Sequence, residues 1–223
     1  MRNLKYIADS WKGLQRESNK DQFNVLIEEN YALFFIYDGV SSSKNATLGI
    51  DAVIEFCKKS HKYYYQNDDF LLSQMIEDMN ICLLRMKTKD AFTTCCITYI
   101  PYDENLPVKI THLGDSRIYG VDKNQRIFTD DHNDPVQRNM LTKCLGLDRL
   151  GNQDFYEKNI ENPPPRILLC TDGFYNVMEA NSDLFSNILN LADINVVKLK
   201  IVESINFQNY DDATYLIISI DIS

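Results

Sequence analysis

The feature that most constrains the fold is the order in which strand-like and helix-like periods follow one another. Short apolar segments typical of strands come in runs, and pairs of segments with helical spacing interrupt those runs. Ile50, Val53 and Cys57 fall on one face of a helix, and residues 72–83 repeat that spacing. A parallel doubly wound sheet would instead show single strands alternating with single helices. We therefore predict an α+β sandwich of mainly antiparallel sheets covered by helices.

The same periodicity gives approximate bounds for each element. We predict strands at residues 4–10, 23–28, 31–37, 94–102, 108–113, 117–121, 126–129, 154–160, 166–171 and 213–222. We predict helices near residues 50–57, 72–83, 136–145, 183–191 and 195–207. No repeat, low-complexity tract or charge block marks a linker, so we expect residues 1–223 to form a single domain.

The charge and the cysteines limit the class of protein. The formal net charge of −9 argues against a nonspecific nucleic-acid binder and against a basic membrane-surface patch. The six cysteines lie mostly in apolar runs without metal-ligand spacing, so we interpret them as reduced core residues. The N-terminal segment lacks the apolar core of a signal peptide, and the longest apolar stretch, 31–37, is far shorter than the roughly 20 residues that span a bilayer. We expect a cytoplasmic protein.

Aspartates stand at the ends of several apolar strands. Asp38 follows FFIY, Asp172 follows ILLCT, Asp115 follows THLG, and Asp211 precedes a fourth strand in NYDDATYLIISI. Each one has an ordinary interpretation, because Asp-Gly is a favoured hairpin turn and an aspartate at a strand end often caps a turn. The set has a second interpretation, in which strands from distant parts of the chain bring these carboxylates to one sheet edge.

A cluster of carboxylates needs a compensating charge. Unpaired carboxylates within about 4 to 6 Å repel one another and raise one another's pKa, and a divalent cation removes that repulsion. Oxygen ligands without histidine or cysteine favour Mg²⁺ or Mn²⁺ over Zn²⁺. Two such ions can bind a phosphate, activate a bridging water and stabilise the attacking and leaving oxygens. The residues alone therefore indicate metal-assisted phosphoryl chemistry.

A series of short motifs makes the indication more specific. In chain order they are NKD, DG, TT, GDSR, TxDH, CLG, CTDG and DDAT, and they extend from Arg16 to the last strand. This order resembles the metal-dependent, 2C-type serine/threonine protein phosphatases in their short bacterial form. The resemblance implies a four-layer sandwich, with two mainly antiparallel β-sheets flanked by pairs of α-helices.

The resemblance also implies roles for the aspartates. Asp38 would bridge two metal ions, the carbonyl of Gly39 would touch the second ion, and Asp172 and Asp211 would complete the first. Asp21 of NKD would reach the second ion through water.

Two further residues match the motifs. Asp115 would hold, with Asp172, a weaker third ion. Arg16 lies five positions before Asp21, where the family places a phosphate-binding arginine, and its planar fork suits a phosphoryl group. Taken without the motif, Arg16 would be interpreted as a solvated surface charge.

Several positions depart from the family pattern. Lys20 stands where the family usually has Glu or Gln, so it would either weaken the second metal site or point outward. The glycine pair that commonly follows DG is replaced by Val40 and three serines, so this loop is expected to be reshaped. Val40 also stands where eukaryotic members have a candidate general acid, so metal-bound water would protonate the leaving alkoxide. We interpret His132 as structural, bracing its loop by hydrogen bonds.

The largest departure is a deletion. Bacterial relatives carry a flap between the TxDH histidine and the segment that ends in LG, and the flap controls the approach of the substrate. Here Gly146 follows His132 after only fourteen positions, and residues 134–139 already resemble the segment after the flap. The flap subdomain is therefore expected to be largely missing, leaving partner docking elsewhere to supply specificity.

We therefore predict a Mg²⁺/Mn²⁺-dependent protein serine/threonine phosphatase that attacks phosphoprotein substrates directly through a metal-bridging hydroxide. The alternative is a catalytically weak member of the fold that serves as a regulatory or binding module, which Lys20 and the altered loop would favour. A carboxylate-metal nuclease fits the aspartates, but it does not fit the charge of −9 or the GDSR and DDAT motifs.

Overall fold

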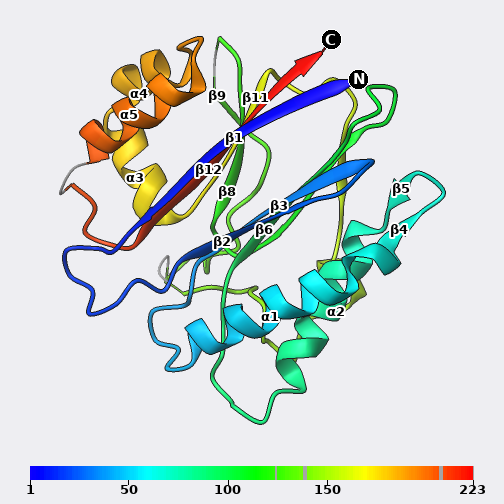
Figure 1. Ribbon diagram of the computed structural model, residues 1–223. Helices are drawn as coiled ribbons and strands as arrows, with labels where there is room; N and C mark the ends of the chain where they lie inside the picture. Colours follow the sequence, from blue (N-terminus) through cyan, green and yellow to red (C-terminus); the bar gives the residue numbers. More distant parts are fainter. Residues whose placement is uncertain (124, 138–139, 206–207, 223) are drawn as a thin grey trace.

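The computed structural model describes residues 1–123, 125–137, 140–205 and 208–222. In these ranges two five-stranded antiparallel sheets pack face to face, and helices cover both outer faces (Figure 1). This arrangement confirms the predicted α+β sandwich. Layers of apolar side chains separate the first group of helices, the two sheets and the second group of helices.

The first sheet holds both ends of the chain. Its strands lie in the order β1 (Arg2–Trp11), β12 (Ala213–Ile222), β11 (Arg166–Cys170), β8 (Arg117–Val121) and β9 (Gln125–Ile127). The outer face of this sheet is covered by α3 (Asp172–Ala180), α4 (Ser182–Leu189) and α5 (Ile194–Ile205). The long pairing of β1 with β12 places the N-terminal strand beside the last one in Figure 1.

The second sheet is built mainly from the first half of the chain. Its strands lie in the order β10 (Lys158–Ile160), β7 (Val108–Leu113), β6 (Cys95–Pro101), β3 (Tyr31–Tyr37) and β2 (Gln22–Ile27). Helices α1 (Ala46–Ser60) and α2 (Leu72–Leu84) cover its outer face. Between them lie a 3-10 turn at His61–Tyr64 and a small hairpin of β4 (Tyr65–Gln66) and β5 (Asp69–Phe70).

The central strands are apolar along their whole length because both of their faces are covered. In β3, Leu33 and Phe35 pack under α1 and α2, whereas Phe34 and Ile36 point into the layer between the two sheets. This alternation follows from the two-residue period of a strand. It explains why β3, β11 and β12 read as continuous hydrophobic runs.

Two predicted elements differ from the structure, and one helix was not predicted. The described residues of 136–145 form bends and isolated bridges, so the predicted helix is wrong. Asp134 Oδ1 accepts the N–H groups of Val136 and Gln137 at 2.8 Å each. The predicted strand at 154–160 begins only at Lys158, because a 3-10 turn occupies Asn152–Asp154. Helix α3 is absent from the predicted elements, and the last two positions of the predicted helix 195–207 lie outside the described residues.

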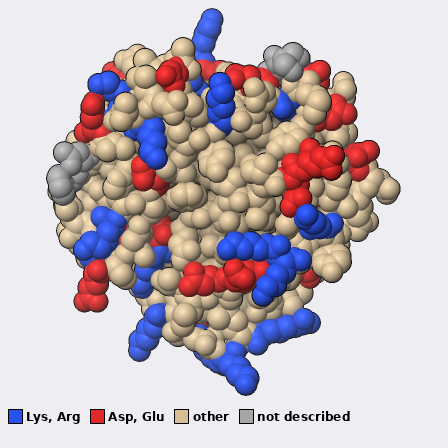
Figure 2. Space-filling view, in the orientation of Figure 1, with Lys and Arg blue, Asp and Glu red and all other residues tan. Residues whose placement is uncertain are grey.

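Two surface properties bear on the class of protein. None of the helices in the described ranges is both long enough and apolar enough to cross a lipid bilayer. Figure 2 shows Lys and Arg side chains interspersed with Asp and Glu on the displayed face. All six cysteines are unpaired.

Candidate metal centre

The strand registers bring the predicted aspartates to one edge of the sandwich. In the second sheet Gln22 pairs with Tyr37, so Asp21, just before β2, lies beside Asp38, just after β3. In the first sheet the end of β11 pairs with the starts of both β8 and β12. Asp172 follows β11. It therefore lies beside the turn that carries Asp115 before β8 and beside the segment that carries Asp211 before β12. Antiparallel pairing is what makes distant segments converge here.

Three of the aspartates face one cavity of 370 Å³. Asp38, Asp115 and Asp172 contribute to its lining, together with Val40, Ser41, Ser42, Phe92, Thr94, Met140, Leu141, Cys144 and Leu147. Thr94 fixes Asp38 at the cavity: its N–H donates to the carbonyl of Asp38 at 2.8 Å, and its hydroxyl accepts the N–H of Asp38 at 3.1 Å. The carboxylates from β3, from the turn before β8 and from the start of α3 are thus positioned together.

Asp21 lies buried beside this cavity, only 5% exposed. Its Oδ2 accepts the hydroxyl of Thr171 at 2.8 Å, whereas its Oδ1 is buried without a hydrogen-bond partner among the described residues. Burial raises the pKa of Asp21 to about 8, and repulsion from Asp212 and Asp172 contributes. A buried carboxylate oxygen without a partner suits a cation or a cation-bound water.

The carboxylates at the cavity are also electrostatically unfavourable without a cation. Burial raises the pKa of Asp38 well above its usual range, and the charges of Asp21 and Asp172 raise it further. Burial and the charge of Asp115 raise the pKa of Asp172 to about 7. Burial also raises the pKa of Asp115, partly opposed by a hydrogen bond with Asn133. The protein thus confines several carboxylates where a positive charge would stabilise their ionised forms.

Arg16 and Asp211 contact each other next to the cavity aspartates, and the charges of both act on Asp172. Arg16 donates from Nε and Nη2 to the two carboxylate oxygens of Asp211, and neither residue lines the cavity. The hydrogen bond to Asp211 raises the pKa of Arg16. As the side chains stand, no group of three or more His, Cys, Asp or Glu residues in the described part of the chain is arranged to hold an ion. The hydrogen bonds from Arg16 occupy both carboxylate oxygens of Asp211, which the predicted role assigns to a metal ion.

The donor set nevertheless fits Mg²⁺ or Mn²⁺. The candidate ligands are carboxylates and one backbone carbonyl, and the unpartnered Oδ1 of Asp21 supplies a buried donor that nothing else uses. Gly39 permits the close packing there, because a Cβ at this position would lie 2.9 Å from the carbonyl oxygen of Lys20 and from the Cβ of Ala46. A metal would require Asp211 to exchange Arg16 for the ion.

The side chain of Lys20 faces the loop after Gly39. Its Nζ donates to the carbonyls of Ser41 and Ser43 at 3.0 Å each. Ser43 is itself buried, and its hydroxyl donates to the carbonyl of Asp90 at 2.5 Å. The ammonium group of Lys20 thus binds the loop that replaces the glycine pair, and Ser41 of this loop lines the cavity.

His132 braces the turn that carries Asp115. The N–H of Gly114 donates to His132 Nδ1 at 3.1 Å, and the N–H of His132 donates back to the carbonyl of Gly114 at 3.0 Å. The ring of His132 also stacks on the buried His112, with centroids 4.7 Å apart. Gly114 has a φ of +108°, a conformation that favours glycine. These contacts support the structural interpretation of His132.

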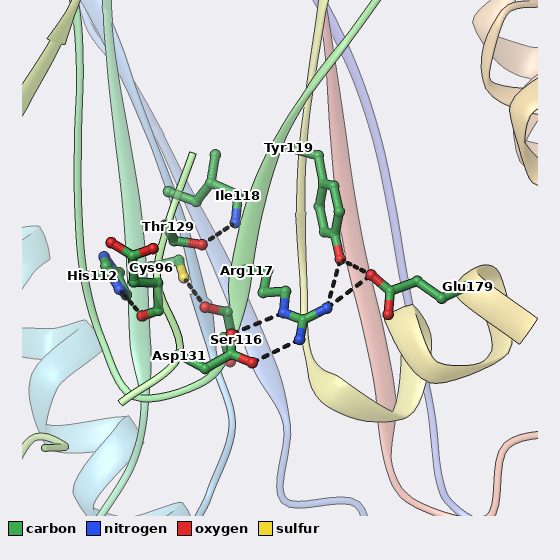
Figure 3. Close-up of polar contacts among 10 residues, drawn as sticks. Cys96, His112, Ser116, Arg117, Ile118, Tyr119, Thr129, Asp131 and Glu179 are labelled. Atoms are coloured by element: carbon green, nitrogen blue, oxygen red, sulfur yellow. Dashed lines mark hydrogen bonds and ion pairs between the residues drawn. The ribbon is translucent and has the colours of Figure 1, made fainter. Parts of the chain in front are cut away.

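Arg117 joins three segments around the site, as Figure 3 shows. Its Nε and Nη2 donate to Asp131 at 2.8 and 2.6 Å, and its Nη1 donates to Glu179 of α3 at 2.8 Å. The guanidinium carbon lies 3.8 Å from the ring centroid of Tyr175. Arg117 therefore ties β8 to the loop before His132 and to the helix that begins with Asp172.

Two residues at the site were absent from the sequence-based predictions. Asp212 is 4% exposed, and its carboxylate accepts the N–H groups of Gly13 and Lys20 at 2.8 Å each. Thr171 links Asp21 to the last strand, because its hydroxyl also accepts the N–H of Thr214 at 2.9 Å. The second aspartate of DDAT and the threonine of CTDG are the signals that could have identified them.

Comparisons with known proteins agree with this geometry. Residues 15–198 match the family model described as Protein phosphatase 2C. Serine/threonine phosphatase Stp1 from Staphylococcus aureus is 20% identical, with a TM-score of 0.77, and the match covers 100% of this chain and 96% of that one. A search of curated proteins found no match.

Two further solved structures are similar. The PPM Ser-Thr phosphatase MsPP from Mycobacterium smegmatis is 18% identical, with a TM-score of 0.70 and coverage of 96% of this chain and 97% of that one. PppA from Pseudomonas aeruginosa is 18% identical, with a TM-score of 0.73 and 98% coverage of both chains. At these identities the structures establish the fold, whereas the family model covers most of the chain. This protein belongs to the protein phosphatase 2C family.

Proposed function

We propose that this protein hydrolyses phosphoserine and phosphothreonine in phosphoproteins with the help of Mn²⁺ or Mg²⁺. The observation that carries the proposal is the convergence of Asp38, Asp115 and Asp172 on one cavity, beside the buried and unpartnered Oδ1 of Asp21. We take residues 1–223 as one catalytic domain. Its proposed location is the cytoplasm, where the unpaired cysteines would stay reduced.

The roles of the residues follow from their positions. Asp38, with the carbonyl of Gly39, would hold two ions; Asp172 and Asp211 would complete the first, and Asp21 would reach the second through water. Asp115 would add a weaker third site with Asp172. When bound, the ions would activate a water for attack on phosphorus and neutralise the charge on the phosphoryl oxygens.

Arg16 would bind the phosphoryl group after leaving Asp211. A guanidinium presents its paired N–H groups to a phosphate as it does to a carboxylate, so one planar fork can serve both partners. Asp211 would thus position Arg16, which would exchange this carboxylate for the phosphoryl group when the substrate binds. Because Val40 offers no proton at the cavity, water would protonate the leaving alkoxide.

The proposal includes the loss of the flap subdomain. In residues 132–146 the described part forms bends, turns and two isolated bridges, Asn133 with Leu141 and Leu145 with Thr93, and it contributes Met140 and Leu141 to the cavity wall. This short segment supplies few contacts to a peptide on either side of the phosphorylated residue. Discrimination among phosphoproteins would then depend on surfaces outside the cavity.

Hydrolysis of p-nitrophenyl phosphate and of a phosphothreonine peptide tests the proposal. We expect both to be cleaved with Mn²⁺ or Mg²⁺ and neither to be cleaved in EDTA. Full activity after the metal has been stripped would refute the metal-dependent mechanism.

A catalytically weak binding module is the second candidate, and the contact between Arg16 and Asp211 favours it. If that pair does not open, a phosphoprotein could bind without being hydrolysed. Tight binding of a phosphoprotein in Mn²⁺ with no phosphate release would support this candidate. Phosphate release at a rate that depends on the metal concentration would exclude it.

A further inference from the structure

A second pocket, of 350 Å³, lies between the loop after β1 and helix α5. Apolar side chains of Trp11, Leu14, Val202 and Ile205 make most of its wall. Leu14 is 53% exposed and Val202 is 39% exposed. Leu199, three positions before Val202 on the same helix face, is 63% exposed and extends the apolar surface. A contiguous exposed surface of this kind marks an interaction site.

This pocket is built on the same two segments as the Arg16 site. The N–H of Leu14 donates to the carbonyl of Asn209 at 3.1 Å. A Cβ on Gly13 would lie 2.4 Å from the carbonyl carbon of Asp211, so the two segments are in direct contact. In Figure 1 the blue loop after β1 lies beside the segment that leads into β12. The position of the pocket is therefore fixed relative to Arg16.

The wall of the pocket is preformed. Trp11 stacks on the buried Tyr215, with ring centroids 5.6 Å apart and an interplanar angle of 23°. The side-chain amide of Asn209 donates to the carbonyl of Lys12 at 3.3 Å and closes one end. A wall held in this way loses little conformational freedom when a ligand binds.

We propose that this pocket, called here the Trp11 pocket, binds a large apolar side chain of the phosphoprotein substrate. This inference rests on the proposed function. Leu14 and Arg16 are two residues apart, so their Cα atoms are separated by at most about 7 Å. An extended peptide advances about 3.3 Å per residue. We therefore expect the apolar side chain two or three residues from the phosphorylated one.

Charge favours a phosphorylated polypeptide over a second copy of this chain. Lys12 lines the Trp11 pocket, and its ammonium group donates to the backbone carbonyl of Arg16 at 3.1 Å, so one cationic side chain stands at the rim. A phosphorylated segment brings negative charge to this rim. Two copies of a chain with a net charge of −9 repel each other instead.

Paired peptides test the inference. Two sets of phosphothreonine peptides would carry leucine or alanine at the second and third positions on either side of the phosphothreonine. With Mn²⁺ we expect kcat/KM to be about tenfold higher for the best leucine peptide than for its alanine counterpart. Leu14→Ser and Val202→Ser should reduce this ratio toward one. Leu48→Ser, on α1 with the same 53% exposure as Leu14, should preserve it.

The single tryptophan supplies a second readout that does not depend on turnover. Peptides with a phosphonate in place of the phosphate are not hydrolysed, and their binding can be followed by the fluorescence of Trp11. We expect a saturable change with the leucine phosphonate peptide, at least about fivefold tighter than with the alanine peptide. Val202→Ser should remove this preference.

The outcomes separate this inference from the proposed function. Hydrolysis with equal kcat/KM for all peptides, together with an unchanged Trp11 signal, would overturn the Trp11 pocket and leave the phosphatase intact. If p-nitrophenyl phosphate and every peptide resisted hydrolysis, the proposed function would fail, and fluorescence would still decide whether the pocket selects an apolar side chain. A dimer that Val202→Ser dissociates would assign the pocket to self-association and contradict the inference.

Discussion

Arg16 donates hydrogen bonds to both carboxylate oxygens of Asp211, so the predicted phosphate-binding residue is held by a predicted metal ligand. Asp211 cannot offer the same lone pairs to a guanidinium and to a cation, and a phosphate would compete with Asp211 for Arg16. The two residues lie 195 positions apart in the sequence. We propose that their contact couples metal binding to substrate binding.

Substitution of Arg16 should separate these two functions. We expect Arg16→Ala to raise KM for a phosphothreonine peptide about tenfold or more, because a charge-assisted contact of roughly 1.5 to 3 kcal/mol is lost. Binding of Mn²⁺, measured by calorimetry, should be as tight as in the wild type or tighter, since Asp211 is released. Arg126→Ala, a change of an exposed arginine on β9, is the matched control. Unchanged kinetics in Arg16→Ala would return Arg16 to the role of a surface charge.

Lys20 should matter for the loop more than for the metal. Replacing it by the family's usual residue in Lys20→Gln removes the two hydrogen bonds to Ser41 and Ser43. We expect faster amide hydrogen exchange in residues 40–45 and no gain in Mn²⁺ affinity. Lys44→Gln, which changes an exposed lysine in the same loop, should leave exchange unaltered. A tenfold or greater gain in Mn²⁺ affinity for Lys20→Gln would show that the cation opposes the metal after all.

The stability of the metal-free protein should fall as the pH rises. The pKa values of Asp21, about 8, and of Asp172, about 7, lie above the ordinary value of 3.8, so the folded protein binds protons that the unfolded chain releases. The contribution of these bound protons to the free energy of unfolding is fully present below the ordinary pKa. It is lost as the pH rises through 7 to 8. The melting temperature in EDTA should therefore decrease between about pH 5 and about pH 8.5.

Two comparisons separate the effect of these carboxylates on the melting temperature from the effects of the other titrating groups. Asp21→Asn should flatten the decrease in melting temperature, because its amide does not ionise. Mn²⁺ should raise the melting temperature more at high pH than at low pH, because protons compete with the ion for the carboxylates. Equal slopes in Asp21→Asn and the wild type would contradict the assigned pKa shift.

Arg117 should contribute to stability by holding α3 and the loop of Asp131 together. Its side chain is 17% exposed, and Arg117→Met would leave the carboxylates of Asp131 and Glu179 without their partner. We expect a loss of about 2 to 4 kcal/mol in the free energy of unfolding, or about 5 to 10 °C in melting temperature. Arg126→Met, at an exposed arginine that packs on Phe128, should cost much less. Similar losses in the two variants would mean that the Arg117 contacts are not specific.

The positions of Asp38, Asp115, Asp172 and Asp211 could be predicted because each follows or precedes a strand that is buried on both faces. Asp21 precedes the partly exposed strand β2, so only its NKD motif indicated it. The apolar run fixes the end of the strand, and antiparallel pairing brings alternate ends to the same edge. The orientation of Asp211 could not be predicted, because it depends on Arg16, which is distant in the sequence. Helix α3 was missed because Asp172 and Gly173 also form a typical turn signal, which hides the helical spacing of Phe174 and Val177.

The segment at 136–145 shows the opposite error. Val136, Met140 and Leu141 have helical spacing. The carboxylate of Asp134, however, accepts the N–H groups of Val136 and Gln137 in a turn, and Pro135 favours the same turn. Met140 and Leu141 line the cavity instead of packing on a helix face. The hydrogen bonds of the turn therefore determine the backbone conformation of this segment, and its apolar side chains line the cavity.

The most direct test is phosphate release from a phosphothreonine peptide by protein that has been stripped with EDTA and then titrated with Mn²⁺. We expect wild-type protein and Asp183→Asn, which changes an exposed aspartate on α4, to regain activity as the metal is added. Asp38→Asn and Asp172→Asn should remain lower by several orders of magnitude while unfolding cooperatively, because both residues line the proposed metal cavity. Full activity in Asp38→Asn, or full activity of the stripped wild type without metal, would contradict the proposed metal centre.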